Sequence, residues 1–312
     1  MKKKNDPIAI LSADYHLSHN PPIWRSNESD WYDAMARPLH EINELQEKYK
    51  CPVLCAGDIF DKWNSPAELI NFALKNLPDE IYAVPGQHDI PNHNIQEIAR
   101  SAFASLTLTE RINWTTHVGI KNLYVNSFPY GRVINPVQNY RKADLNVALV
   151  HDYVWMRGHS YPNAPKEKQI PRVIKKNNKN MIDRKYYGYD MVVYGDNHAG
   201  FTTTIGKTTI WNCGALMRRD KDQIDYKPRV GLLYSDGHVE PYYLDVSKDK
   251  HLTADEMKDA KEFEEIDMEK FAVELRKLGT SSLDFAEAMK RFWCTNNTRK
   301  AVQDIVSKAM EK

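Results

Sequence analysis

The first 200 residues alternate short apolar runs with helical patterns, and this alternation constrains the fold more than any other feature of the chain. The segments 31–50, 65–77 and 94–106 place apolar side chains at helical spacing. Strand–helix alternation of this kind predicts a layered α/β domain. The strand candidates between and after the helices are residues 7–14, 51–58, 80–89, 145–152 and 189–198.

The pattern changes after about residue 200. Residues 201–216 and 229–246 resemble two β-hairpins, with turn signals at Gly206 and at residues 235–237. We expect their antiparallel strands to complete a second sheet. Beyond about residue 248 the chain becomes charged and helical in pattern, so the sequence predicts two parts, residues 1–248 and 249–312.

Composition sets limits on the class of protein. The chain is 42% hydrophobic and 27% charged, as ordinary globular proteins are, and its net charge of +1 provides no overall basic field for nucleic acid. No stretch approaches the roughly 20 apolar residues of a membrane span. The N-terminal apolar run is short and broken by Asp14, which favours a first strand over a signal peptide.

The cysteines indicate a reducing compartment. Cys51 and Cys55 lie in an extended-looking segment, where their Cα atoms would be about 13 Å apart, too far for a disulfide. We therefore expect Cys51, Cys55, Cys213 and Cys294 to be free thiols and the protein to be cytoplasmic, with no membrane partner.

Every strand candidate ends in polar side chains. In open α/β sheets ligands bind at the carboxyl ends of strands, so these residues should meet at one edge. A single Asp or His after a strand is ordinarily a turn or cap residue, but turn preference does not explain five in order. The residues are Asp14 and His16, Asp58 and Asp61, Gln87 with His88 and Asp89, His151 with Asp152, and Asp196 with His198.

The residue types suit a divalent metal. Carboxylate, imidazole and amide oxygen bind ions such as manganese, magnesium, iron or zinc. A turn after the first strand would let Asp14 and His16 point at one ion although they are two residues apart. Asp58 is central in the series and is the natural bridge between two ions, about 3.5–4 Å apart.

The motifs "DYHLS", "GDIFD", "GQHD", "HD" and "GDNH" resemble, in order and spacing, the five motifs of calcineurin-like metallophosphoesterases. The resemblance covers about residues 8–245. Within that superfamily, "DYHLS", "GDIFDKWNSP" and "WNCGALMRR" are most similar to the nuclease subunit of SbcCD-type (Mre-Rad-type) DNA repair complexes. This implies an α/β fold, a layered two-sheet sandwich flanked by helices, with a catalytic domain over 1–248 and a helical C-terminal tail over 249–312.

The resemblance also implies roles for the strand-end residues. His88 would face the phosphate as general acid or transition-state stabiliser, and Asp61 would be an outer group. The metals would be two divalent ions, typically manganese, with magnesium or iron as alternatives. One ion would be held by Asp14, His16, Asp58 and His198, and the other by Asp58, Gln87, His151 and Asp196.

Two positions depart from the family pattern. Gln87 stands where the third motif normally has Asn, and Asp196 stands where the fifth normally has His. Both keep an oxygen for a metal, and the added charge of Asp196 favours harder ions than zinc. Either both metal sites are filled or the second is weakened and one metal dominates.

The leading hypothesis is a metal-dependent DNA exonuclease and endonuclease. A water activated by the two metals would hydrolyse phosphodiester bonds in DNA repair or recombination. The resemblance implies a homodimer and an SMC-like coiled-coil ATPase partner bound by residues 280–312, through Leu283, Phe285 and Trp293. The alternative is that these apolar side chains pack on the catalytic domain. The basic stretch 157–185 is either a phosphate-backbone contact or a solvated loop. Alternatives are a phosphoesterase for a nucleotide or phosphoprotein, and a non-catalytic metal-binding scaffold.

Overall fold

The computed structural model describes residues 6–137, 145–161, 163–170 and 186–253, together with Glu256 and Trp293. The chain divides into two compact units, residues 1–251 and 252–312, and every strand and helix named below belongs to the first. The expected helical tail, with Leu283 and Phe285, lies outside the described residues. Trp293 is buried.

The first sheet has five strands in the order β11-β10-β1-β2-β3. Three of them are parallel neighbours, namely β1 (Ala9–Ser12), β2 (Val53–Cys55) and β3 (Ile81–Ala83). The other two form an antiparallel hairpin, β10 (Arg229–Leu233) and β11 (Val239–Tyr243), and β10 pairs antiparallel with β1.

The second sheet has six strands in the order β4-β5-β6-β7-β9-β8. Its central pairs, from β5 through β6 and β7 to β9, are parallel, and β4 and β8 are antiparallel edge strands. The strands are β4 (His117–Ile120), β5 (Leu123–Phe128), β6 (Leu145–His151), β7 (Met191–Gly195), β8 (Phe201–Ile205) and β9 (Thr208–Asn212).

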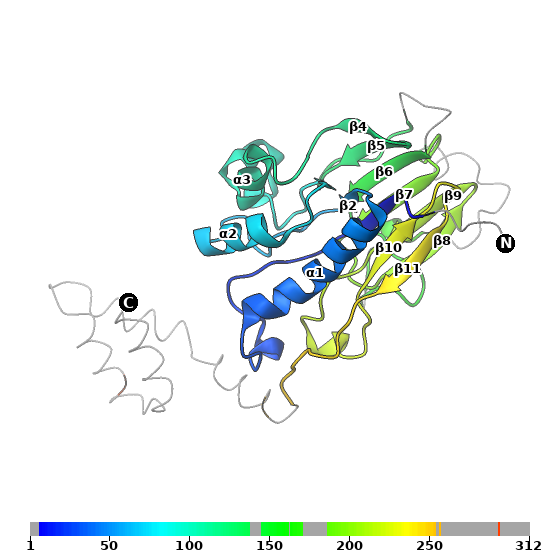
Figure 1. The fold of residues 1–312 in the computed structure, drawn as a ribbon. Helices are drawn as coiled ribbons and strands as arrows, with labels where there is room; N and C mark the ends of the chain where they lie inside the picture. The colour runs from blue at the N-terminus through cyan, green and yellow to red at the C-terminus, as the bar shows by residue number, and fades with distance from the viewer. Residues whose placement is uncertain are drawn as a thin grey trace, which may run out of the picture. The chain divides into compact units, whose positions relative to one another are not determined.

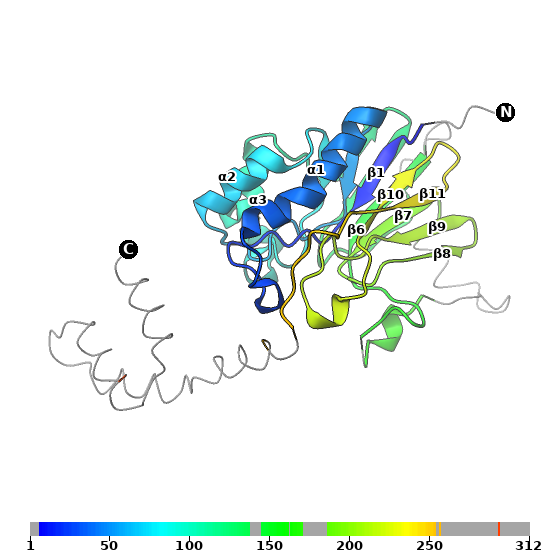
Figure 2. The same cartoon turned by 60° about the horizontal axis from the view of Figure 1, so that its bottom comes forward.

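Three α-helices cover the outer face of the first sheet (Figures 1 and 2). They are α1 (Trp31–Tyr49), α2 (Ala67–Asn76) and α3 (Ala102–Leu108). The side chain of Asp30 accepts a hydrogen bond from the backbone N–H of Asp33 and so caps α1. Short 3₁₀ helices are η1 (Ile23–Arg25), η2 (Pro91–His93), η3 (Ile95–Arg100), η4 (Lys166–Lys168) and η5 (Lys221–Gln223).

The core explains why the strands appear in the sequence as continuous apolar runs. Along β1, Ile10 packs in the cluster under the helices, whereas Leu11 packs between the two sheets. Along β6, Leu149 faces the first sheet, whereas Val150 packs in a third cluster on the far face of the second sheet. Since both faces of these strands are buried, hydrophobic residues occupy successive positions.

The expected fold class is confirmed: two mixed sheets pack face to face and helices flank them. The expectation that both hairpins complete the second sheet is wrong for residues 229–246, because β10 pairs with the free edge of β1 in the first sheet. Only the hairpin 201–216 extends the second sheet. The single helix expected over 94–106 is also wrong. Ser101 is extended and caps a new helix, α3, so η3 and α3 are separate.

Two further expectations concern the cysteines and the membrane. Cys51, Cys55 and Cys213 are buried free thiols, and Cys294 lies outside the described residues. None of the helices in the described ranges combines the length and apolar character that crossing a membrane requires.

Candidate metal centre

The carboxyl ends of strands from both sheets meet at one edge of the sandwich. His151, the last residue of β6, places Nδ1 2.5 Å from the backbone oxygen of Ala56, just after β2. The backbone N–H of Asp196, just after β7, donates to both carboxylate oxygens of Asp14, just after β1, at 3.0 and 3.1 Å. Strand ends far apart in sequence therefore converge, as the sequence predicts.

Several of these residues leave their strands in a left-handed backbone conformation. The φ angles are 53° at Asp14, 44° at His16, 52° at Asp58 and 77° at Asp196. L-residues other than Asn, Asp and His rarely adopt this region, and such strained positions concentrate at functional sites. The reversal interrupts strand alternation, so that Asp14 and His16 both reach the same group of side chains.

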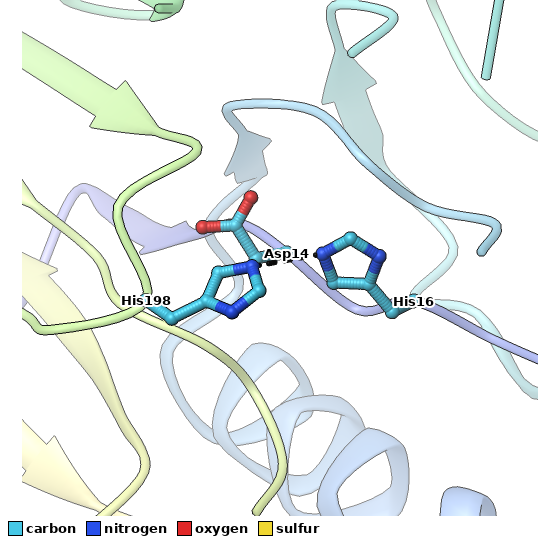
Figure 3. Close-up of side chains that lie close together, drawn as sticks. All are labelled: Asp14, His16 and His198. Carbon is cyan, nitrogen blue, oxygen red and sulfur yellow. Dashed lines mark hydrogen bonds between the residues drawn. The ribbon is translucent and has the colours of Figure 1, made fainter. Parts of the chain in front are cut away.

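The first group is Asp14, His16 and His198 (Figure 3), whose ligand-capable atoms all lie within 4.8 Å of one another. The Nε2 atoms of the two imidazoles are 3.0 Å apart. Burial lowers the pKa of His16 and lowers the pKa of His198 to about 3. Both rings are therefore neutral, which is the form of imidazole that binds a metal.

The second group is Asp14, Asp58 and His151, which are all buried and also within 4.8 Å. Asp58 Oδ1 accepts a hydrogen bond from the backbone N–H of His88 at 3.0 Å. Asp58 Oδ2 is buried and finds no hydrogen-bond partner among the described residues. It lies 3.3 Å from His151 Nε2 and 3.7 Å from His16 Nε2, between the two groups. In the metal-free protein this oxygen is balanced by its ion pair with His151, and a shared cation would take over that role.

Gln87 and Asp196 complete this edge. Gln87 Oε1 accepts a hydrogen bond from His151 Nε2 at 2.6 Å, and Gln87 Nε2 donates to Asp196 Oδ1 at 2.6 Å. The two ring nitrogens of His151 thus both face oxygen acceptors, which requires the imidazolium form. Burial lowers the pKa of His151, but the negative charges of Asp58, Asp14 and Asp196 outweigh this and raise the pKa to about 10. The edge is therefore built to hold positive charge.

His88 and Asp61 lie beside the first group. His88 is exposed, its Nδ1 lies 2.8 Å from the backbone oxygen of Asp61, and its ring meets that of His16 edge-on at 4.8 Å. The Asp61 carboxylate contacts Arg219 at 2.9 Å and His16 Nδ1 at 3.5 Å. Burial raises the pKa of Asp61, but its contacts with His16 and Arg219 outweigh this and hold the pKa well below its usual range. Asp61 is therefore an anion that orients His16.

A family model for calcineurin-like phosphoesterases matches residues 10–200, more than half of the chain, and this range contains all five strand-end motifs. The chain belongs to the calcineurin-like phosphoesterase family. The expected superfamily is thus confirmed, and members typically bind divalent metals, for which this phosphoesterase has candidate ligand residues. The narrower SbcCD-type branch remains a prediction.

Several solved structures resemble this chain at low similarity. An archaeal phosphodiesterase is 13% identical, with a TM-score of 0.40, covering 76% of this chain and 99% of its own. The sulfate thiohydrolase SoxB of Thermus thermophilus is 12% identical, with a TM-score of 0.44, covering 81% of this chain and 59% of its own. Vps29 of Entamoeba histolytica is 17% identical, with a TM-score of 0.33, covering 76% and 98%. No curated protein sequence matches the phosphoesterase. At this similarity the neighbours indicate nothing about its substrate.

The two residues that depart from the family pattern contact each other. Gln87 replaces Asn and Asp196 replaces His, and the hydrogen bond between their side chains joins the two departures. The longer Gln87 side chain reaches across the edge from the β3 end to the β7 end. A histidine at position 196 could accept this bond only through a ring nitrogen that would otherwise bind metal.

Two residues support the site in ways that the sequence does not indicate. Asp89 follows a strand but has no predicted role, and Arg219 is not among the predicted site residues. The buried Asp89 carboxylate accepts hydrogen bonds from the backbone N–H groups of Ile59, Phe60 and Gly86, at 3.2, 2.9 and 3.0 Å. It thereby ties the loop after β2 to the loop after β3. Arg219 Nη1 donates to the backbone oxygen of His16 at 2.8 Å as well as pairing with Asp61. The only signal for Arg219 was its place in "WNCGALMRR", which does not indicate a contact.

Metal binding by the phosphoesterase should release a proton. In the metal-free protein His151 stays protonated up to its pKa of about 10, and it must lose this proton before Nε2 can bind a metal. Metal affinity should therefore rise with pH by up to about tenfold per unit and level off above that pKa. Calorimetric titration in two buffers of different protonation enthalpy measures the protons released. Affinity that does not change between about pH 7 and 9 would contradict this account.

Gly57→Ala should disrupt the metal centre. Gly57 has φ 102°, and an added Cβ would lie 2.2 Å from His151 Nδ1, so His151 would have to move. Gly131→Ala is the matched control, because Gly131 has φ 80° and no atom of the described residues lies within 4 Å of an added Cβ. Both variants should lose about 1–3 kcal/mol of unfolding free energy through backbone strain. Only Gly57→Ala should also lose metal, as measured by metal content after dialysis; equal metal content in the two variants would refute the steric argument.

Proposed function

We propose that this phosphoesterase is a metal-dependent DNA nuclease that cleaves phosphodiester bonds during repair or recombination. The observation that carries its chemistry is the convergence of Asp14, Asp58 and His151, with His16 and His198, at one edge beside the exposed His88. Support for DNA as substrate comes from the resemblance of its motifs to the SbcCD-type nuclease subunit. The same resemblance supports manganese as the metal and residues 280–312 as the binding segment for an SMC-like ATPase.

The ligand set divides into two overlapping parts. Asp14, His16 and His198 would hold one ion, Asp58 would bridge, and His151 with Gln87 and Asp196 would hold the other. When bound, two divalent ions supply a water of lowered pKa and Lewis-acid stabilisation of phosphate oxygens. The buried Asp58 Oδ2, which accepts no hydrogen bond among the described residues, and the neutral imidazoles of His16 and His198 fit this role.

His88 is placed to handle the leaving group. Its Nδ1–H donates to the backbone oxygen of Asp61, which fixes the ring and leaves Nε2 for proton transfer. An exposed ring at the rim of the metal edge can reach a substrate, whereas the buried His16 and His151 cannot. His88 is therefore the general acid for the leaving oxygen in this proposal. Asp61 and Arg219 act as positioning residues, since they contact His16 and its backbone.

A phosphoesterase for a nucleotide or a phosphoprotein is the second candidate. The net charge of +1 favours it, because proteins that bind long nucleic acids commonly carry a basic surface. In the described part of the basic stretch 157–185, Lys168 is paired with Asp152 at 2.7 and 2.8 Å, whereas Arg157 and Lys166 are exposed. Residues 171–185 lie outside the described residues.

The assay that separates the candidates compares substrates at fixed manganese concentration. We expect cleavage of linear duplex DNA, alone or with the ATPase partner, to exceed hydrolysis of nucleotide phosphodiesters and phosphopeptides. Asp58→Asn protein purified in parallel controls for contaminating nucleases. If the wild-type protein hydrolyses the small substrates and leaves DNA intact under both conditions, the nuclease proposal is wrong and the second candidate stands.

A further inference from the structure

A cavity of about 540 Å³ opens beside the metal centre. Its lining includes Asp196 and His198 of the metal edge, together with Tyr153, Tyr161 and Tyr226. This volume lies in the range of small-molecule sites. Because the cavity shares two residues with the candidate metal edge, a substrate whose phosphate lies on that edge would place its neighbouring group here.

The charges of the lining disfavour a second phosphate. Asp220 and Asp222 line the cavity in addition to Asp196, and Lys168 is the single Lys or Arg among its described lining residues. The Lys168 ammonium is already paired with both carboxylate oxygens of Asp152. Like charges at close range repel, so the cavity favours a neutral group over a backbone phosphate.

The tyrosines offer a surface for an aromatic ring. The rings of Tyr153 and Tyr161 lie 5.0 Å apart at 47°, and Tyr161 is 53% exposed, so part of its ring is free of protein contacts. The Tyr226 hydroxyl donates to the backbone oxygen of Ala215, which fixes the third ring in the wall. Stacking of a base on such a ring is favourable and does not depend on base identity.

We infer that this cavity binds the nucleobase adjoining the scissile phosphate, and that it prefers bases with an exocyclic amino group. This rests on the proposed function, because it assumes that the metal edge cleaves a nucleotide phosphodiester. Tyr161 supplies the stacking face, and the exposed carboxylate of Asp222 accepts a hydrogen bond from the amino group of adenine, cytosine or guanine. Thymine has no such group and should bind more weakly.

The test uses oligonucleotides that are identical except at the position adjoining the cleaved bond, which carries adenine, thymine or an abasic residue. The wild-type protein should cleave the adenine substrate about 5- to 150-fold more efficiently than the abasic one, in kcat/KM. Tyr161→Ala should abolish that ratio and leave cleavage of the abasic substrate unchanged, while Tyr161→Phe should preserve it. Asp222→Ala, which has no side-chain acceptor, should remove the preference for adenine over thymine. Tyr187→Ala is the control, since Tyr187 is an exposed tyrosine that does not line the cavity.

A binding measurement without turnover provides the second readout. Without added metal, deoxyadenosine monophosphate should bind the wild-type protein more tightly than abasic deoxyribose phosphate, and Tyr161→Ala should remove the difference. If Tyr161→Ala slows all three oligonucleotides equally, or none, the inference is overturned while nuclease activity stands. If the wild-type protein cleaves no oligonucleotide but hydrolyses a simple phosphodiester, the proposed DNA substrate and this inference both fail.

Discussion

Asp58→Asn should lower the kcat/KM for phosphodiester hydrolysis by about 10³-fold or more and remove at least one bound metal. The Asp58 carboxylate lies between the two groups of candidate ligands, and its buried Oδ2 accepts no hydrogen bond among the described residues. Losing a bridging charge removes several kcal/mol of cation stabilisation, which corresponds to a loss of this size. Metal content by elemental analysis and kcat/KM with saturating manganese measure the two effects.

The fold should survive this change, although for a different reason from the one the sequence indicates. A strand-end position suggests a residue outside the core, but Asp58 is fully buried. Asparagine has the same size and keeps the Oδ1 acceptor for the backbone N–H of His88, so the protein should still fold. Its metal-free melting temperature should fall, because the buried His151 imidazolium loses the negative charge 3.3 Å away. Asp152→Asn is the matched control, because Asp152 also follows a strand but pairs with Lys168. An Asp58→Asn protein that keeps two tightly bound ions would contradict the bridging role.

His88→Ala should lower kcat by about 10²- to 10⁴-fold while leaving metal content unchanged. The His88 side chain is exposed, and among the described residues the only polar contact of its ring is from Nδ1 to the Asp61 backbone oxygen. The contact of residue 88 with Asp58 is made by its backbone N–H, which alanine retains. The loss should therefore appear in kcat and not in metal affinity.

A nearby histidine controls for this experiment. His93 is exposed and packs edge-on against Tyr130 at 5.6 Å, so His93→Ala should change kcat little. If His88→Ala keeps wild-type activity, the general-acid assignment is wrong. If, in addition, the wild-type protein shows no metal-dependent hydrolysis, the protein is better described as a non-catalytic metal-binding scaffold. Gln87 and Asp196 would then be substitutions that accompanied the loss of activity.

The parts of the fold that sequence predicts are those set by local pattern. Runs such as 145–152 are apolar at successive positions because both faces of β6 are buried, so strand positions can be identified without knowing the partners. Pairing is different, since it depends on edges distant in sequence. The hairpin of β10 and β11 joins β1 through the pair Ala9 and Leu233, and nothing within 229–246 indicates that choice.

The candidate site likewise has residues that the sequence predicts and residues that it does not. Asp14, Asp58, His151 and His198 could be named from sequence because each follows a recognisable strand or motif, and the structure brings them together. The contributions of Asp89 and Arg219 could not be predicted from sequence, because these side chains act through backbone groups of distant loops. A sequence pattern does not show which backbone N–H or C=O group a side chain will reach. The tyrosine-lined cavity likewise depends on loops that meet only in the folded chain.

Anomalous diffraction from crystals of the wild-type protein grown with manganese tests the shared-cation account most directly. We expect two peaks about 3.5–4 Å apart, both next to the Asp58 carboxylate, with His198 beside one peak and His151 beside the other. A single peak remote from Asp58, or two peaks on different faces of the domain, would show that these side chains do not jointly bind a pair of ions.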